Sequence, residues 1–199
     1  NLTETIDACV KKIDMEVADE ECTVEDLIKI IKGPDFPTGA VIMGKKGIQE
    51  AYRTGQGKCV VRSVCEIEET SRGKSQIIVT EIPYQVNKAR MLEKMGELVK
   101  EKKLEGISGI RDESNRNGIR IVIDLKASAN PRVMLNKLYK HTALQENISM
   151  IMLAIVNGRP KVLNLKEILE EYLKHQKDVV TRRTKYDLNT ETGIMNYIH

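Results

Sequence analysis

Five basic side chains within residues 41–65 have the charge to contact phosphate groups. They are Lys45, Lys46, Arg53, Lys58 and Arg62. The same segment contains one acid, Glu50, and its single aromatic residue, Tyr52, does not make the interleaved aromatic pattern that would suggest base stacking. Lysine and arginine neutralise nucleic-acid phosphates without reading base sequence. The segment therefore predicts a sequence-independent contact with a nucleic-acid backbone, and an ordinary solvated surface remains the alternative.

A second basic set, Arg182, Arg183 and Lys185, lies near the end of an expected long helix. Phosphate contact explains this set, and so does the attraction between cations and the carbonyl end of a helix. Net charge does not decide between the two explanations. The chain of 199 residues carries a formal charge of only +3, so the distribution of charge must show any affinity for nucleic acid.

Residues 39–45 spell G-x-x-x-x-G-K, the spacing of a nucleotide-binding loop. Lys46 follows where such a loop needs Ser or Thr to hold magnesium, and the intervening Ala-Val-Ile-Met is typical of a strand. We therefore expect no nucleotide site here. The cysteines and histidines show no metal-ligand spacing, which favours free, buried thiols in a reducing cytosol. No apolar run approaches a membrane span, and the first residues resemble neither a signal nor a transit peptide.

The strand and helix that follow residue 75 organise the expected core. The strand is rich in β-branched residues, namely Ile77, Ile78, Val79 and Ile82. Pro83 ends it, because proline has no N–H for a ladder. Asn87 caps a helix, and its apolar residues fall on one face: Met91, Leu92, Met95, Leu98 and Val99.

Charged residues on this helix are expected to pair locally. Arg90 with Glu93, and Lys94 with Glu97, stand three residues apart, a spacing at which helix side chains meet. Lys88 has no acid at that spacing, so we expect it to face solvent.

Period-two alternation predicts two further strands. Segment 58–68 places four residues on one face: Cys59, Val61, Cys65 and Ile67. Segment 118–126 likewise turns four residues inward: Ile119, Ile121, Ile123 and Leu125. Residues 71–74 are predicted as a hairpin turn, and the apolar run 150–156 as a central strand turned by Asn157-Gly158.

Helices are predicted by capping residues and apolar stripes. Asn1 begins one whose stripe is Leu2, Ile6, Cys9, Val10 and Ile13. Thr23 with Asp26 caps a second, and Asn130-Pro131 opens a third. Residues 165–188 read as one long helix. The fold class is therefore α/β, α+β in strict terms: a mixed or antiparallel sheet of roughly five or six strands, flanked by helices, with a long C-terminal helix.

Several motifs, taken together and in order, resemble the DNA gyrase A-subunit family, the breakage-reunion subunits of bacterial type IIA topoisomerases. They are GPDFPTGA (33–40), EAYRTGQGK (50–58), VTEIPYQVNKAR (79–90), EGISGIRDES (105–114), GIRIVIDLK (118–126), NGRPKVLNLKEILEEYLKHQ (157–176) and VVTRRTKYDL (179–188). The resemblance covers residues 1–188. It implies a tower-like domain over 1–164, the start of a coiled-coil helix over 165–188, and a divergent tail over 189–199.

The resemblance also implies an activity that this chain does not carry alone. Members of the family act as two A and two B subunits, with ATP and Mg²⁺ on the B subunit, and pass one DNA duplex through a break in another. The A subunits form a homodimer, and the enzyme works in the bacterial cytoplasm on the nucleoid. The family's catalytic tyrosine stands in an R-Y-T context. None of the tyrosines here has that context, and each is interpreted as a packing residue: Tyr52, Tyr84, Tyr139, Tyr172, Tyr186 and Tyr197.

Within the resemblance, this segment is expected to support bent duplex DNA and to join the cleavage core to the coiled coil. No residue of the chain is predicted to be catalytic, to ligate a metal or to bind a cofactor. Gln56 stands where the family commonly has a basic residue, which removes one expected phosphate contact. Two alternatives remain: the A subunit of topoisomerase IV, which decatenates DNA, and a structural module without DNA affinity.

Overall fold

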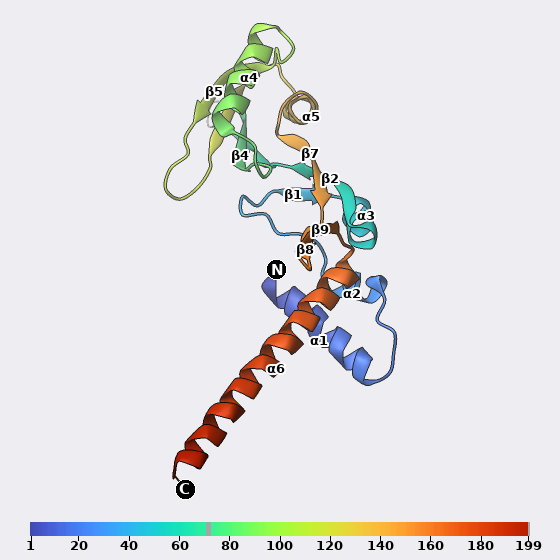
Figure 1. Cartoon of the computed structure of the whole chain (residues 1–199). Coiled ribbons are helices and arrows are strands. Elements are labelled where there is room, and N and C mark those ends of the chain that lie inside the picture. The colour runs from blue at the N-terminus through green and yellow to red at the C-terminus, as the bar shows by residue number, and fades with distance from the viewer. Residues whose placement is uncertain (71–72, 199) are drawn as a thin grey trace. The chain divides into compact units, whose positions relative to one another are not determined.

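The computed structural model describes residues 1–70 and 73–198, with side chains described through residue 191. The described helices are α1 (Leu2–Val17), α2 (Val24–Ile30), α3 (Lys46–Thr54), α4 (Lys88–Lys100), α5 (Pro131–His141) and α6 (Leu165–Ile198). The strands are β1 (Val41–Met43), β2 (Gln56–Arg62), β3 (Val64–Glu69), β4 (Ser75–Glu81), β5 (Ile107–Asp112), β6 (Ile121–Leu125), β7 (Gln145–Ile151), β8 (Leu153–Val156) and β9 (Arg159–Val162). Figure 1 shows these elements in chain order. No described helix is both long and apolar enough to cross a membrane.

The mixed α and β fold class is confirmed, although the described strands outnumber those expected and form three sheets. Their orders are β3-β4-β6-β5, β1-β2-β7 and β8-β9. The chain divides into two compact units that do not follow chain order. Unit 1 contains residues 1–33, 48–57 and 150–199, and unit 2 contains residues 34–47 and 58–149.

Unit 2 is built on the sheet β3-β4-β6-β5, whose neighbouring strands are antiparallel. β4 and β6 pair with Ile77 opposite Ile123 and Val79 opposite Ile121. Because side chains alternate along a strand, these four residues point to one face, where all are fully buried. The alternation predicted for residues 118–126 is therefore confirmed over β6, residues 121–125, whereas residues 118–120 lie outside the strand.

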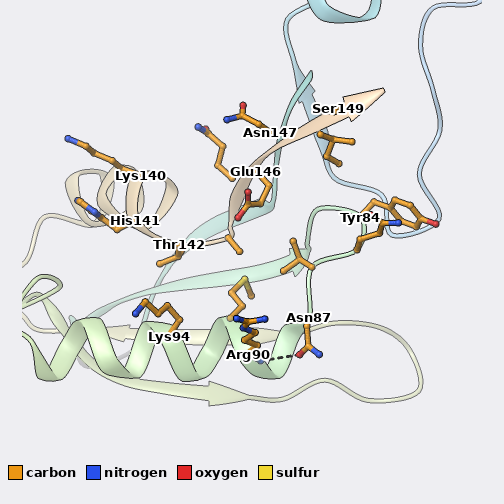
Figure 2. Close-up of a pocket in the computed structure, with 16 residues that line it drawn as sticks. Tyr84, Asn87, Arg90, Lys94, Lys140, His141, Thr142, Glu146, Asn147 and Ser149 are labelled. Atoms are coloured by element: carbon orange, nitrogen blue, oxygen red, sulfur yellow. Dashed lines mark hydrogen bonds between the residues drawn. The ribbon is translucent and has the colours of Figure 1, made fainter. Parts of the chain in front are cut away.

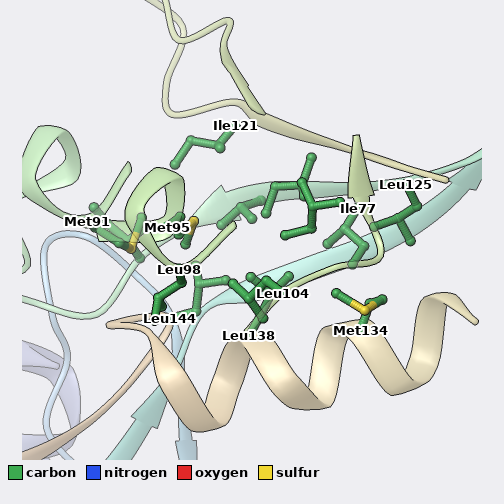
Figure 3. Close-up of a cluster of buried hydrophobic side chains, with 14 residues drawn as sticks. Ile77, Met91, Met95, Leu98, Leu104, Ile121, Leu125, Met134, Leu138 and Leu144 are labelled. Atoms are coloured by element: carbon green, nitrogen blue, oxygen red, sulfur yellow. The ribbon is translucent and has the colours of Figure 1, made fainter. Parts of the chain in front are cut away.

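Helices α4 and α5 cover that face of the sheet (Figure 3). Asn87 accepts a hydrogen bond from the backbone N–H of Arg90 at 3.0 Å, so α4 begins where its cap was predicted. The apolar residues expected on its inner face belong to the core cluster. Met134 and Leu138 of α5 complete the cluster beneath Ile77 and Leu125.

Three charged residues of α4 were expected either to pair locally or to face solvent. Lys94 contacts Glu97 at 2.8 Å, as predicted. Arg90 forms no ion pair with any described residue. The expectation that Lys88 faces solvent is wrong, because its ammonium lies 2.7 Å from Asp112 at the end of β5.

The alternation predicted for residues 58–68 breaks at Ser63, between β2 of the sheet β1-β2-β7 and β3 of the sheet β3-β4-β6-β5. Residues 58–68 form two strands, not one, because Ser63 leaves the ladder and its N–H donates to the carbonyl of Leu144 at 2.8 Å. A register shift follows at Val64/Cys65. Cys59 and Val61 are buried as expected, whereas Ile67 is exposed, so its predicted inward position is wrong. The predicted turn at 71–74 lies partly outside the described residues.

Unit 1 contains α1, α2, α6 and the β8-β9 hairpin. Thr23 and Asp26 form the predicted capping box of α2. The apolar stripe predicted on α1 exists, but Leu2, Ile6, Val10 and Ile13 are exposed in this chain, and Ala8 and Cys9 are the helix's buried residues. Ion pairs Lys12–Glu170 and Lys177–Glu16, both at 3.1 Å, join α1 to α6.

Two expectations for the end of the chain change in the structure. Residues 150–156 are not a central strand: Ile151, Leu153 and Ile155 are exposed, and β8 pairs only with β9 among described strands. Asn157 and Gly158 do turn this hairpin, with φ of 52° and 77°. Helix α6 continues to Ile198, past the expected end at residue 188, as the single red helix of Figure 1.

We predict that Leu138→Ala lowers the free energy of unfolding by about 2–5 kcal/mol, because Leu138 is fully buried and truncation leaves a cavity. Val133→Ala, on the same helix but 51% exposed, is the matched control. Urea unfolding followed by circular dichroism measures both. Equal losses in the two variants would contradict the placement of the core.

The Lys88–Asp112 pair should make stability depend on pH. Hydrogen bonds from Lys88 and from Ser114 lower the pKa of Asp112 from 3.8 to about 2. A lowered folded-state pKa means that the pair stabilises the fold above pH 3.8 and that this contribution is lost as the pH falls toward 2. As the pH is lowered from about 6 to about 2, the urea midpoint of unfolding should therefore fall less steeply for Asp112→Asn than for the unmodified chain. Glu93→Gln is the control, and an identical slope for Asp112→Asn and the unmodified chain would contradict the pairing.

Candidate nucleic-acid interface

The five basic residues of the expected phosphate contact are divided between the two units. Arg53 belongs to unit 1, whereas Lys45, Lys46, Lys58 and Arg62 belong to unit 2. Lys45, Lys46 and Lys58 are exposed, and none of the three forms an ion pair with a described residue. These three lysines are called the lysine cluster below.

A close backbone contact brings the lysine cluster together. Gly47 lies so near β2 that a Cβ atom added to it would stand 1.8 Å from the carbonyl oxygen of Lys58 and 3.2 Å from Sγ of Cys59. Only a residue without a side chain fits there. Lys45 and Lys46 immediately precede Gly47, so this contact brings their backbone near that of Lys58 although Lys58 stands apart in the sequence.

The turn before the lysine cluster explains the G-x-x-x-x-G-K spacing. Val41–Met43 is a strand paired with Val60–Arg62, as the residue types predicted. Gly44 follows with φ of 82°, a left-handed conformation that favours glycine, and α3 begins at Lys46. Val41–Met43, three of the four residues between the two glycines, are therefore held in a sheet, not in a loop wrapped around a phosphate.

Arg53 is engaged by an acid that the sequence did not indicate. Its Nε and Nη2 atoms donate to the two carboxylate oxygens of Glu25 at 2.6 and 3.1 Å. This hydrogen bonding lowers the pKa of Glu25 and raises the pKa of Arg53. The partners are 28 residues apart, on α2 and α3, so no local spacing announces the pair. A phosphate would have to compete with Glu25 for this guanidinium.

Arg62 is likewise held inside unit 2. Its Nε donates to Oε1 of Gln145 at 2.8 Å, and its guanidinium lies 4.5 Å from the centre of the Tyr139 ring. Burial raises the pKa of Tyr139, whose hydroxyl donates to the carbonyl of Ser63. Arg62 therefore fastens β2 to β7 and α5, a packing role that the alternation of β2 did not reveal.

The basic residues of α6 and the tyrosines, which the sequence also singled out, differ in exposure and in ion pairing. Arg182 pairs with Asp178 at 2.9 Å, while Arg183 and Lys185 are exposed. Tyr52 and Tyr139 pack as expected, whereas Tyr172 and Tyr186 are largely exposed. The side chain of Tyr197 lies outside the described residues. Within the described chain, no group of His, Cys, Asp and Glu side chains is arranged to hold a metal ion.

Comparisons with known proteins place the whole chain in one family. The family of DNA gyrase/topoisomerase IV A subunits matches residues 1–199. The match continues past Leu188, where the motif resemblance ended. Among curated relatives, the DNA gyrase A subunit of Clostridium acetobutylicum is 54% identical over 188 residues, covering 94% of this chain and 22% of the relative.

Two more relatives carry the same name. The DNA gyrase A subunit of Streptococcus pneumoniae is 51% identical over 187 residues, covering 94% of this chain and 22% of the relative. That of Escherichia coli K12 is 51% identical over 189 residues, covering 94% of this chain and 21% of the relative. The chain thus spans about a fifth of the length of these relatives. The match over all 199 residues shows that the chain belongs to the family of DNA gyrase and topoisomerase IV A subunits.

Proposed function

We propose that this chain is part of a DNA gyrase A subunit, within an ATP-dependent type IIA topoisomerase that cuts, passes and religates duplex DNA to introduce negative supercoils. The family match and the shared name of the relatives support this proposal. In this proposal the segment supports bent duplex DNA and links the cleavage core to the long helix α6.

The lysine cluster is the proposed contact with the DNA backbone. The observation that carries this assignment is the close approach of the Gly47 backbone to Lys58, which brings the backbone of Lys45 and Lys46 near Lys58. None of the three lysines has an acidic partner among the described residues. Exposed ammonium groups attract phosphates without reading bases. Arg53 and Arg62 are assigned a lesser share, because Glu25, Gln145 and Tyr139 already engage them.

The partners proposed for the whole protein are double-stranded DNA, a second A subunit, with which the first forms a homodimer, and the gyrase B subunit. ATP and Mg²⁺ belong with the B subunit in this proposal, and no residue of this chain is assigned to bind them. The chain alone is proposed to be inactive, because none of its tyrosines has the family's R-Y-T context. Its bacterial relatives support work in the bacterial cytoplasm, on the nucleoid.

Two observations support alternative functions. The family description also covers topoisomerase IV, so decatenation is the alternative activity of the assembled enzyme. The internal engagement of Arg53 and Arg62 favours a structural module with weak or no DNA affinity. DNA binding by the isolated chain separates this second alternative from the proposal.

We predict salt-dependent binding of the chain to a short fluorescent duplex, measured by anisotropy over a salt series. The slope of log affinity against log salt is negative, and it moves toward zero by roughly 0.9 for each phosphate contact removed. Changing Lys45, Lys46 and Lys58 to Ala should therefore flatten the slope. Arg53→Ala and Arg62→Ala should change it little.

The matched control removes three exposed lysines of unit 2 that lie outside the lysine cluster. These are Lys100, Lys126 and Lys137. The control loses the same net charge, so a general charge effect would change the salt slope equally in both triple variants. Equal slopes in the two would assign the contact elsewhere, and negligible binding by the unmodified chain would favour the structural module.

We also predict that Gly47→Ala destabilises the chain by about 1–3 kcal/mol or more, because the added methyl group forces the backbone at residue 47 away from β2. Gly96→Ala is the counterpart inside α4, where the space around the added atom is open. It should stabilise by about 0.5–1 kcal/mol, since alanine favours helix. Thermal unfolding of both variants checks the prediction, and a neutral Gly47→Ala would contradict the close contact.

A further inference from the structure

Two chain crossings lie together in unit 2 and join its two sheets. β2, in the sheet β1-β2-β7, passes into β3, in the sheet β3-β4-β6-β5, through Ser63. Helix α5, which packs on the second of these sheets, passes into β7 of the first through residues 142–144. The crossings are in contact, because the N–H of Ser63 donates to the carbonyl of Leu144 at 2.8 Å. The hinge is defined as residues 62–65 and 142–145.

A second contact, called the latch, joins the same two sheets without a chain crossing. It fastens the loop before β1 to the end of β4 and the residues just after it. The ring of Phe36 stacks on that of Tyr84, with centroids 5.6 Å apart and an angle of 18° between the planes. The backbone N–H of Ala40 donates to the carboxylate of Glu81. The latch is defined as residues 36–40 and 81–85.

An open groove of about 800 Å³ extends between the hinge and the latch (Figure 2). Thr142 and Gln145 of the hinge line it, and so do Tyr84 and Gln85 of the latch. Its walls include the start of α4, which packs on the sheet β3-β4-β6-β5, and β7 of the sheet β1-β2-β7. Figure 2 shows Thr142 just after the end of α5 and Tyr84 farther along the same groove. Solvent space, not packed core, therefore lies between α4 and β7.

The hinge and the latch also hold groups in unfavourable surroundings. Oγ of Ser63 and Oγ1 of Thr38 are the buried side-chain oxygens that have no hydrogen-bond partner among the described residues. One lies in the hinge and the other in the latch. A buried hydroxyl without a partner has lost the hydrogen bonds that water would give it, and exposure restores them.

The backbone of the latch is held in an unfavourable conformation as well. Ala40 and Gln85 have φ of 71° and 66°, in the left-handed region that residues with side chains disfavour. Residues persist in this region only where surrounding contacts fix them. The stack of Phe36 on Tyr84 and the hydrogen bond to Glu81 supply such contacts. Release of the latch therefore relaxes both left-handed residues.

We propose that this junction opens: the latch releases, and the sheet β1-β2-β7 turns about the hinge relative to the sheet β3-β4-β6-β5, which widens the groove. Opening gives water to the hydroxyls of Ser63 and Thr38 and relaxes the latch backbone, which offsets the contacts that are lost. Local openings of this kind have free energies below that of global unfolding. β2 and β7 continue into unit 1, so the hinge is a bend point between the core under α4 and α5 and the strands that lead to unit 1. The movement needs no DNA, so it is independent of the contact proposed for the lysine cluster.

Hydrogen exchange of backbone amides in the 199-residue chain, followed by NMR, measures this opening. The N–H of Ala40 reports on the latch and that of Ser63 on the hinge, because each donates a hydrogen bond across its contact. Ile123, in β6 between β4 and β5, reports on the core. Ala40 and Ser63 should show one common opening constant, about tenfold or more larger than that of Ile123.

Two variants test whether the latch and the hinge open together. Glu81→Ala removes the acceptor in the latch and should speed exchange at Ser63 by about tenfold, because a hydrogen bond to a charged group is lost. Its control is Glu66→Ala, which removes an exposed acid of the neighbouring strand β3. Ser63→Ala removes the unpaired hydroxyl of the hinge and should slow exchange at Ala40 by about fivefold or more, because only the closed junction buries that group. Its control is Ser128→Ala, which changes an exposed serine of unit 2.

Circular dichroism confirms that each variant is folded, and Ser63→Ala decides alone where Glu81→Ala does not fold. Faster exchange at Ser63 in Glu81→Ala and slower exchange at Ala40 in Ser63→Ala, with both controls unchanged, support one opening. A response confined to the altered end, or no response, overturns the proposal. Equal protection of Ser63 and Ile123 in the unmodified chain overturns it as well.

Discussion

Unit 2 depends on the packing of β4 and β6 against α4 and α5. The side chains of Ile77 and Ile123 meet between the strands, and Met95 and Leu138 close over them from the helices. Each is fully buried, so this contact removes apolar surface from water, which stabilises the unit. This packing fixes both helices on one face of the same sheet.

With one Phe and no Trp, the chain builds this core from aliphatic and thioether side chains. Met91, Met95 and Met134 fill the space between sheet and helices, where an unbranched side chain adapts to irregular gaps. On the opposite face, Ile78 and Val122 are also buried. Arg111 and Gln76 both donate hydrogen bonds to the carboxylate of Asp124, which joins β4, β5 and β6.

Tertiary contacts divide the basic residues into two classes. Arg53, Arg62 and Lys88 are fastened to Glu25, Gln145 and Asp112, and they hold elements together. The lysine cluster, by contrast, is assembled by a backbone contact at Gly47 and stays exposed. A nearly neutral chain can thus present local positive charge, because many of its acids are engaged elsewhere in pairs.

The sequence by itself determined the family and most local structure. Caps at Thr23, Asn87 and Asn130, the strand alternation around Ile121 and the turn at Asn157 all depend on neighbours a few residues away, and each is confirmed. Only the tertiary structure decided which charges are free and which apolar faces are covered. Arg62 and Gln145 are 83 residues apart, and the exposed stripe of α1 looks no different in sequence from the buried stripe of α4. Burial and ion pairing depend on which distant residues the fold places next to a side chain. The spacing of residues along the chain does not encode those neighbours.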